Sequence, residues 1–240
     1  MTLYAIGDIH GQFDMLTEAL SRIEKDGGKD AQIVFLGDYT DRGPRSRDVI
    51  DLLIDGQEQG RNWVLLKGNH DRMFEWFLRD PSLEDPHLFH DLSWIHERLG
   101  GMTTLASYGV DTTGRPRRSE LQEEARALVP QSHIDFLKNL PLTYETEDLF
   151  FTHAGVRPGV PLKEQTENDL IWIRQEFVDD TRDHGKLVVH GHTAIDIAQH
   201  YGNRVNLDSG AGYGRPLTAA VFEDNTVFTL GENGRIPLLP

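Results

Sequence analysis

The sequence predicts an α/β fold in which two β-sheets pack against each other and helices flank them. The first third alternates short apolar runs with amphipathic segments, the middle is rich in helical patterns, and the final third returns to short apolar runs. Buried strands joined by helical crossovers form parallel sheets, and two packed sheets can hold all of these strands in one domain. We therefore expect a single domain over residues 1–240, with a mostly helical insertion at about residues 72–141.

The first third is predicted to run strand, helix, strand, helix, strand. The apolar runs at 3–6, 33–36 and 63–66 have the length of strands, and a Gly-Asp or Gly-Asn pair follows each run. Helical spacing of apolar residues predicts helices that begin near Phe13 and near Pro44, a residue type suited to the first turn of a helix. Ligand sites of parallel sheets lie beyond the carboxyl ends of the strands, which is where the polar pairs fall.

The rest of the chain is assigned from the same patterns. Helices are expected at 73–78, 94–99, 120–128 and 133–140. Strands are expected at 149–152, 186–189, 204–207, 217–222 and 226–230. Asp224-Asn225 separates the last two strands and predicts a hairpin turn.

Composition limits the classes of partner. The chain has 39 Asp and Glu and 24 Lys and Arg, which gives a net charge of -15. This charge argues against nucleic acid as a partner, because proteins bind nucleic acid mainly through Lys and Arg. No apolar run approaches the roughly 20 residues of a membrane span, and no signal peptide is recognisable. The absence of Cys fits a reducing compartment. We therefore expect a cytoplasmic protein that binds neither nucleic acid nor membranes; the sequence does not predict its oligomeric state.

Five short motifs that combine Asp, Asn or His with Gly each follow an apolar run. They are Gly7-Asp8-Ile9-His10-Gly11, Gly37-Asp38-Tyr39-Thr40-Asp41-Arg42-Gly43, Gly68-Asn69-His70-Asp71, Thr152-His153-Ala154-Gly155 and His190-Gly191-His192-Thr193. Mixed carboxylate, amide and imidazole ligands suit Mn, Fe or Zn, and the absence of thiolates excludes a structural zinc knuckle. Together the motifs indicate one binuclear metal centre for the hydrolysis of phosphate esters.

The positions of the candidate ligands support this interpretation. Asp8 and His10 lie two residues apart, so an extended segment directs both side chains to the same side. Asp38 follows the neighbouring strand and can bridge two cations with its two oxygens. Three more candidate ligands follow other strands: Asn69, His153 and His192. A single buried Asp or His is usually a turn cap or a core residue, but their joint placement at strand ends favours a metal site.

These motifs resemble the metallophosphoesterase (calcineurin-like) superfamily, and specifically the phosphoprotein phosphatase family with its small bacterial and phage members. That family carries Gly-Asp-x-His-Gly, Gly-Asp-x-x-Asp-Arg-Gly and Gly-Asn-His-Glu, followed by two isolated metal-binding histidines. The first two motifs match in full, and the third has Asp71 where Glu is usual. The resemblance spans residue 4 to about 214 and implies a sandwich of two mixed β-sheets flanked by helices, with the metal site at the carboxyl ends of strands.

The resemblance also implies two divalent metal ions, with Mn favoured and Fe or Zn as alternatives. One ion would be held by Asp8, His10 and Asp38, and the other by Asp38, Asn69, His153 and His192. A hydroxide that bridges the ions would attack phosphorus directly.

The resemblance assigns roles to the remaining polar residues of the motifs. His70 would act as general acid, with Asp41 orienting it, since a carboxylate fixes the tautomer of a His and raises its pKa. Arg42 would bind phosphate oxygens in a fork that Lys does not reproduce. The segment Leu170-Ile171-Trp172-Ile173-Arg174 looks like the Ile-Trp-x-Arg of the phage and bacterial members, so Arg174 is assigned as a second phosphate clamp. Asn69 would also contact the substrate phosphate.

Two further residues are left open by the sequence. His190 and His192 lie two apart and could both face the site, but the family's Gly-His-Thr places the ligand at His192 and leaves His190 in the core or behind the ligand. Tyr213 lies on a Gly-rich loop where larger relatives carry an aromatic that contacts substrate, and a plain loop tyrosine is equally compatible.

The predicted function is hydrolysis of phosphomonoesters in proteins or small molecules, with phosphoserine and phosphothreonine first and phosphotyrosine included. One alternative is the symmetrical diadenosine tetraphosphatase, which typically has Gly-Asp-Leu-Val-Ala-Arg-Gly; Asp41 stands where that family has Ala and favours the phosphatase. The other is an inactive scaffold that binds phosphoproteins, which the complete set of ligands and the acid disfavours.

Overall fold

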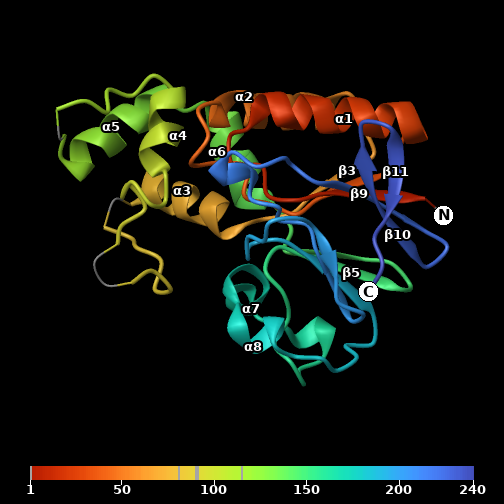
Figure 1. The fold of residues 1–240 in the computed structure, drawn as a ribbon. Helices are drawn as coiled ribbons and strands as arrows, with labels where there is room; N and C mark the ends of the chain where they lie inside the picture. Colours follow the sequence, from red (N-terminus) through yellow and green to blue (C-terminus); the bar gives the residue numbers. More distant parts are fainter. Residues whose placement is uncertain (1, 81, 90–91, 115) are drawn as a thin grey trace.

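The computed structural model describes residues 2–80, 82–89, 92–114 and 116–240. Two mixed β-sheets pack face to face, as expected (Figure 1). The first has the order β11-β10-β9-β1-β2-β3, with β1 at Leu3–Ile6, β2 at Ile33–Phe35, β3 at Trp63–Leu65, β9 at Ala219–Glu223, β10 at Thr226–Gly231 and β11 at Gly234–Pro237. The second has the order β4-β5-β6-β8-β7, with β4 at Thr143–Glu145, β5 at Leu149–Thr152, β6 at Leu187–His190, β7 at Gln199–His200 and β8 at Arg204–Asn206.

Helices cover the outer faces of both sheets. The first sheet is covered by α1 and α2, and α7 and α8 lie beside the second (Figure 1). The helices are α1 at Phe13–Gly27, α2 at Ser46–Glu58, α3 at Asn69–Arg79, α4 at Gly101–Ser107, α5 at Arg118–Leu128, α6 at Gln131–Asn139, α7 at Glu167–Trp172 and α8 at Gln175–Val178. Among the described residues, no helix combines the length and apolar character needed to cross a membrane.

Strand alternation explains the layered core. In β1, Tyr4 and Ile6 point into a cluster under the helices, whereas Leu3 and Ala5 point into a second cluster between the sheets. In the second sheet, alternate residues of β5 and β6 divide in the same way between that inner cluster and a third cluster under α7 and α8. Both sheets are therefore buried on both faces, which accounts for the continuous apolar runs in the sequence.

The parallel parts of the two sheets position the motifs. β1, β2 and β3 run parallel, with Ala5 paired to Val34 and Val34 to Val64. β5, β6 and β8 are parallel in the second sheet. The loops that follow parallel strands leave the same edge of a sheet, so the five polar motifs come together.

The structure corrects several predicted elements. The helix expected at 94–99 is a series of turns, because Gly100 takes φ 86° and α4 begins only at Gly101. The strands β4, β7 and β11 were not predicted; each is two to four residues long and lies at the edge of its sheet. The hairpin between β9 and β10 is confirmed, since Asp224 and Asn225 have φ of 48° and 62°, as a two-residue turn requires.

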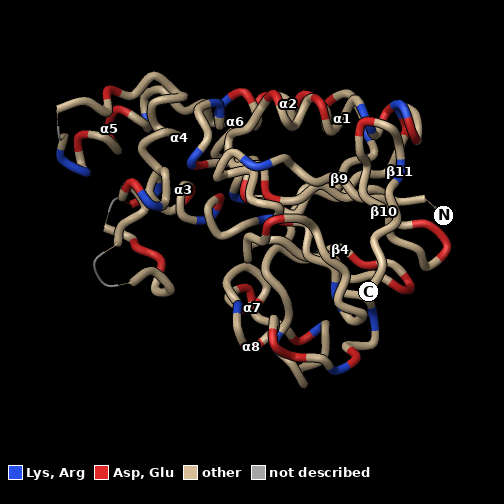
Figure 2. Tube along the Cα trace, in the orientation of Figure 1, with Lys and Arg blue, Asp and Glu red and all other residues tan. Residues whose placement is uncertain are grey.

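The region predicted as a helical insertion holds most of α3 together with α4, α5 and α6, and extends to one side of the sheets (Figure 1). Residues 81, 90, 91 and 115 of this region lie outside the described part of the chain. Acidic segments are spread along α1, α2 and α5 and around α7 and α8 rather than forming one block (Figure 2). The negative charge is therefore distributed over the surface.

Candidate active site

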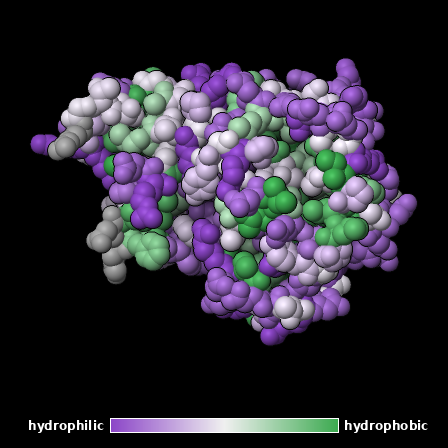
Figure 3. Space-filling model, in the orientation of Figure 1, coloured by the Kyte–Doolittle hydropathy of each residue, from purple (hydrophilic) through white to green (hydrophobic). Residues whose placement is uncertain are grey.

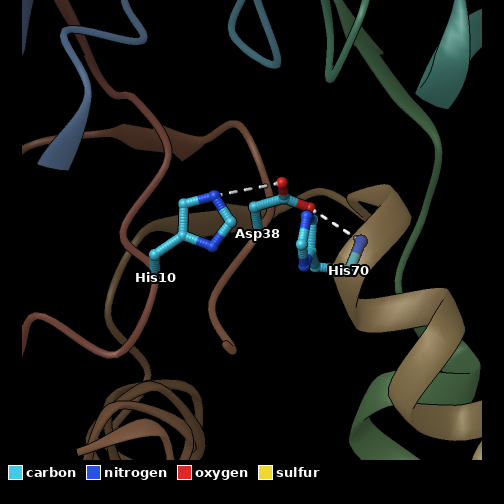
Figure 4. Close-up of side chains that lie close together, drawn as sticks. All are labelled: His10, Asp38 and His70. Atoms are coloured by element: carbon cyan, nitrogen blue, oxygen red, sulfur yellow. Dashed lines mark hydrogen bonds and ion pairs between the residues drawn. The ribbon is translucent and has the colours of Figure 1, made fainter. Parts of the chain in front are cut away.

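Two groups of buried side chains share the carboxylate of Asp38. Its Oδ2 lies 3.4 Å from Nε2 of His10, and its Oδ1 lies 3.5 Å from Nε2 of His153. Figure 4 shows His10 and His70 on either side of this carboxylate. Ligand atoms of His10, Asp38 and His70 lie within 4.8 Å of one another, as do those of Asp38, His153 and His192. Asp38 thus occupies the bridging position between two candidate ion sites.

The tautomers of two histidines favour a cation. Nδ1 of His10 donates to the carbonyl of Thr40 at 2.8 Å, and Nδ1 of His153 donates to the carbonyl of Leu36 at 2.8 Å. Nε2, the other nitrogen of each ring, then faces the oxygens of Asp38. An imidazole that donates its other N–H to a backbone carbonyl is the arrangement typical of metal-bound histidines.

Two further groups complete the second cluster. Nε2 of His192 is buried and has no hydrogen-bond partner, and Oδ1 of Asn69 lies 3.0 Å from Nε2 of His153. Burial lowers the pKa of His192 and of His10 well below the ordinary value, with Arg174 and Arg42 adding to the shift respectively, so both rings are neutral near pH 7. The orphaned nitrogen, the neutral rings and the facing oxygens fit divalent ions well.

Asp8 lies behind these groups, at the end of β1. Both of its oxygens accept from the backbone N–H of His192, at 3.0 and 3.2 Å. Its close approach requires Gly191, where a Cβ would lie 1.9 Å from Oδ1 of Asp8. Burial, then Asp208 and Asp38, raise the pKa of Asp8 well above the usual range. Asp8 is not a member of either group of mutually close ligand atoms among the described residues, so its assignment to the ion at His10 stays a prediction.

His70 and Asp41 form a buried pair. Nδ1 of His70 lies 2.6 Å from Oδ2 of Asp41. Two residues that the sequence did not point to hold the carboxylate: Nε1 of Trp94 donates to Oδ2 and Oγ1 of Thr104 donates to Oδ1, each at 2.7 Å. Asp41 therefore has a fixed orientation and fixes the tautomer of His70, with Nε2 facing the site.

The pKa of His70 in the His70–Asp41 pair differs from the expected value. Burial raises the pKa of Asp41 to about 7 and lowers the pKa of His70 to about 3. Both shifts have the same main cause, because burial disfavours separate charges and the pair holds one proton between Nδ1 and Oδ2. The expected rise in the pKa of His70 is therefore absent, since burial and the charges of Arg42 and Arg174 outweigh the effect of Asp38.

Asp71, the residue that replaces the usual Glu, supports the loop after β2. Its Oδ2 accepts from the backbone N–H of Asp38 at 2.8 Å and of Gly68 at 2.9 Å, and its Oδ1 accepts from Tyr39 at 2.9 Å. Three backbone donors hold this loop around Asp38, whose φ is 54°. This side chain thus shapes the loop that carries the shared ligand rather than reaching the reaction centre, and burial, then Asp38, raise its pKa to about 8.

The two arginines predicted to bind phosphate line the same cavity. Nη1 of Arg42 donates to Nε2 of His10 at 2.6 Å, and Nη2 lies 3.3 Å from Nε2 of His70. Arg174 follows α7 and reaches the carbonyl of His192 at 3.4 Å. The ring of Tyr213 packs 4.7 Å from the guanidinium of Arg42, so this loop tyrosine holds a phosphate-binding candidate in place.

A buried carboxylate that sequence reasoning missed joins the insertion to the site. Oδ2 of Asp85 accepts from Arg72 at 2.6 and 3.0 Å and from Nε1 of Trp172 at 3.0 Å, and its Oδ1 accepts from His87. The ring of Trp172 meets His192 edge-on at 5.7 Å. Asp85 falls in a polar stretch with no motif, so only the fold reveals its contacts.

His190 belongs to the core. Its ring meets Phe177 edge-on at 5.0 Å, and its Nε2 faces Arg204 at 3.5 Å. Burial, then Arg204, lower its pKa to about 3. The strand ends at His190, and His192, whose φ is 65°, lies in the turn that follows and is the one of the two histidines grouped with Asp38.

Comparisons with known proteins identify the family. The calcineurin-like phosphoesterase family matches residues 1–225. The asymmetrical bis(5'-nucleosyl)-tetraphosphatases PrpE of Anoxybacillus flavithermus and Geobacillus thermodenitrificans are each 26% identical, over 89% and 96% of this chain and 87% and 94% of theirs. A structure assigned as a diadenosine tetraphosphatase has a TM-score of 0.66 at 21% identity and covers 99% of this chain and 94% of its own. A cold-active protein-tyrosine phosphatase of Shewanella has a TM-score of 0.66 at 17% identity, covering 99% of this chain and 80% of its own. The chain belongs to the calcineurin-like phosphoesterase family and is a phosphoester hydrolase.

Proposed function

We propose that this protein hydrolyses phosphomonoesters, with phosphorylated proteins as the substrate class. The observation that carries the proposal is the buried His70–Asp41 pair at 2.6 Å beside two groups of metal ligands. Serine, threonine and tyrosine oxygens are poor leaving groups compared with a nucleotide phosphate and need a proton from an acid. A carboxylate held by Trp94 and Thr104 suits this task because it keeps Nε2 of His70 directed at the leaving oxygen.

We further propose that two divalent ions, with Mn first, bind at the shared carboxylate. Asp8, His10 and Asp38 would hold one, and the other ligands are Asp38, Asn69, His153 and His192. Such ions supply Lewis-acid activation of water and neutralise charge on the phosphoryl group.

The other residues act on the substrate. Arg42 and Arg174 grip the terminal oxygens of a phosphate dianion, which a monoester presents and an internal phosphodiester does not. The dianion also brings negative charge next to His70, which favours a proton at its Nε2. That proton passes to the leaving oxygen as the ester bond breaks.

A second candidate function is hydrolysis of dinucleoside tetraphosphates. The names of the PrpE relatives favour it, and those relatives align over nearly their whole length. Those names specify the asymmetrical reaction, which releases a nucleoside triphosphate and a monophosphate, whereas the sequence had suggested the symmetrical one as the alternative. The resemblance at Asp41 sets this chain apart from the symmetrical enzymes and says nothing about the asymmetrical ones.

The test compares kcat/KM for a phosphothreonine peptide, a phosphotyrosine peptide and diadenosine tetraphosphate, with Mn at one salt concentration. We expect the better peptide to exceed the dinucleotide by at least about tenfold. A tenfold preference for the dinucleotide would contradict the phosphatase proposal, and chromatography of the products would then show whether cleavage is asymmetrical. Absence of turnover on every substrate would favour an inactive phosphoprotein-binding scaffold.

A further inference from the structure

A cavity of about 640 Å³ extends outward from the candidate active site. Arg42, Asn69, His70 and Arg174 line the part next to the site. The rest of the lining comes from the insertion, with His87, Leu88, Phe89, Leu92 and Leu99, and from the segment of α7 and α8. A phosphate bound by the two arginines would therefore direct its ester group into this cavity. The lining of the cavity should accordingly match the leaving group.

One wall of the cavity is apolar. It is formed by Leu88, Phe89, Leu92 and Leu99 of the insertion. Phe89 is 81% exposed, more than any other large apolar side chain described. On the left side of the view, where the insertion lies, apolar surface borders a recess (Figure 3). A large aromatic side chain left open to solvent at the mouth of an active site is a candidate for substrate contact.

Two stacked aromatic rings also line the cavity. The ring of Trp172 stacks on His87 with centroids 5.4 Å apart and an interplanar angle of 15°. Asp85 holds both rings, since it accepts from Nε1 of Trp172 and Nδ1 of His87, each at 3.0 Å. A cavity lined by Phe89 and by an indole that a hydrogen bond to Asp85 holds suits a flat aromatic group.

The charges at the rim disfavour a further phosphate. The guanidinium of Arg157 lies 2.6 Å from Asp169 and 3.8 Å from Glu176, so two carboxylates accompany this cation. Arg42 and Arg174 line the part next to the site, where one phosphate would use them. An oligophosphate chain would therefore meet a net negative rim, whereas a neutral group would not.

We propose that this cavity is the leaving-group subsite and that Phe89 selects an aromatic group bonded directly to the scissile phosphate, as in a phosphotyrosyl side chain. The proposal rests on the proposed monoesterase function and names its preferred substrate. It places tyrosyl esters ahead of seryl and threonyl esters, which lack a ring at this position.

The first test is a binding measurement that does not depend on turnover. Phenylphosphonate and methylphosphonate carry the same charged group, and they differ by the ring. With Mn-loaded protein, we expect calorimetry to show tighter binding of phenylphosphonate by about tenfold. Phe89→Ala should reduce that preference about fivefold, in keeping with the loss of an aromatic contact, and Phe89→Trp should retain it.

Leu239→Ala is the matched control, because Leu239 is 73% exposed and does not line the cavity. It should leave both affinities unchanged. If Phe89→Ala weakened the binding of phenylphosphonate and methylphosphonate equally, or weakened neither, the proposed subsite would be overturned.

The second test is turnover of peptides. Phe89→Ala should raise KM for a phosphotyrosine peptide about fivefold and change KM for the matched phosphothreonine peptide less than twofold. If Phe89→Ala raised KM for diadenosine tetraphosphate alone, the group that contacts Phe89 would be a nucleobase, and the tyrosyl assignment would be overturned. If the wild-type protein cleaves no monoester, the proposed function fails, and the two phosphonates still decide whether the cavity selects a ring.

Discussion

At the scale of single residues, the site depends on one carboxylate between two groups of imidazoles. Asp38 approaches His10 with one oxygen and His153 with the other. Asp38→Asn should therefore weaken both ion sites, with metal content after Mn reconstitution falling from about two ions toward none and kcat falling on the order of 100-fold or more. Asp8→Asn is the matched comparison and should weaken the ion at His10 alone. Elemental analysis that finds two ions in Asp38→Asn would show that the ligand assignment is wrong.

The second residue-scale prediction concerns the acid. His70→Asn should lower kcat on a peptide monoester on the order of 100-fold with metal content retained, because proton transfer typically contributes that much. The loss should be smaller on nitrophenyl phosphate, whose leaving group needs little protonation. Asp41→Asn should give a milder version of the same pattern. Equal losses on both substrates would indicate that His70 positions the phosphate instead of donating a proton.

At the scale of elements, Asp85 of the insertion connects α3 to α7, because it binds Arg72 of the first helix and Trp172 of the second. The carboxylate is fully buried and pairs with the equally buried guanidinium of Arg72. Asp85→Ala would leave Arg72 with Glu167, at 3.3 Å, as its remaining carboxylate partner and should lower the free energy of unfolding by about 3 kcal/mol. Trp172→Phe removes one hydrogen bond from Asp85 while keeping the ring, and should cost only about 1 kcal/mol.

Urea unfolding gives these free energies, and the inhibition constant of inorganic phosphate gives a second readout. Because Trp172 lies beside His192 and precedes Arg174, we expect phosphate to bind more weakly in Asp85→Ala, even under conditions in which the variant is fully folded. Unchanged phosphate binding would limit the role of Asp85 to stability. A decrease in the free energy of unfolding for Trp172→Phe as large as that for Asp85→Ala would contradict the explanation from the buried charge pair.

At the scale of the whole molecule, the two sheets share one apolar cluster. Leu3 and Phe222 of the first sheet and Phe151 and Val205 of the second contribute to it, so neither sheet can lose its structure without exposing the inner face of the other. We propose on this basis that the chain is one domain. Metal-free protein should unfold in a single transition that coincides for tryptophan fluorescence and far-ultraviolet circular dichroism. Two separated transitions would contradict the single-domain proposal.

Much of the fold and of the site follows from local sequence. Apolar runs of strand length determine the inner strands, because residues buried on both faces leave no polar alternation. The Gly-Asp and Gly-Asn pairs after these runs place Asp8, Asp38 and Asn69 at one edge, since parallel strands carry their following loops to the same side. The short edge strands β4, β7 and β11 could not be predicted in this way, because none of them contains a run of buried apolar residues.

The partners of these motif residues were decided only by the tertiary structure. Trp94 and Thr104 lie 53 and 63 positions from Asp41, and Asp85 is 87 positions from Trp172. No local pattern encodes such contacts, because they depend on how the insertion packs beside the sheets. The neutral state of His70 is decided in the same way, since burial and neighbouring charges set its pKa. The sequence by itself determined which motif residues follow the strands and meet around Asp38, whereas long-range packing determined their orientation, their protonation and the shape of the neighbouring cavity.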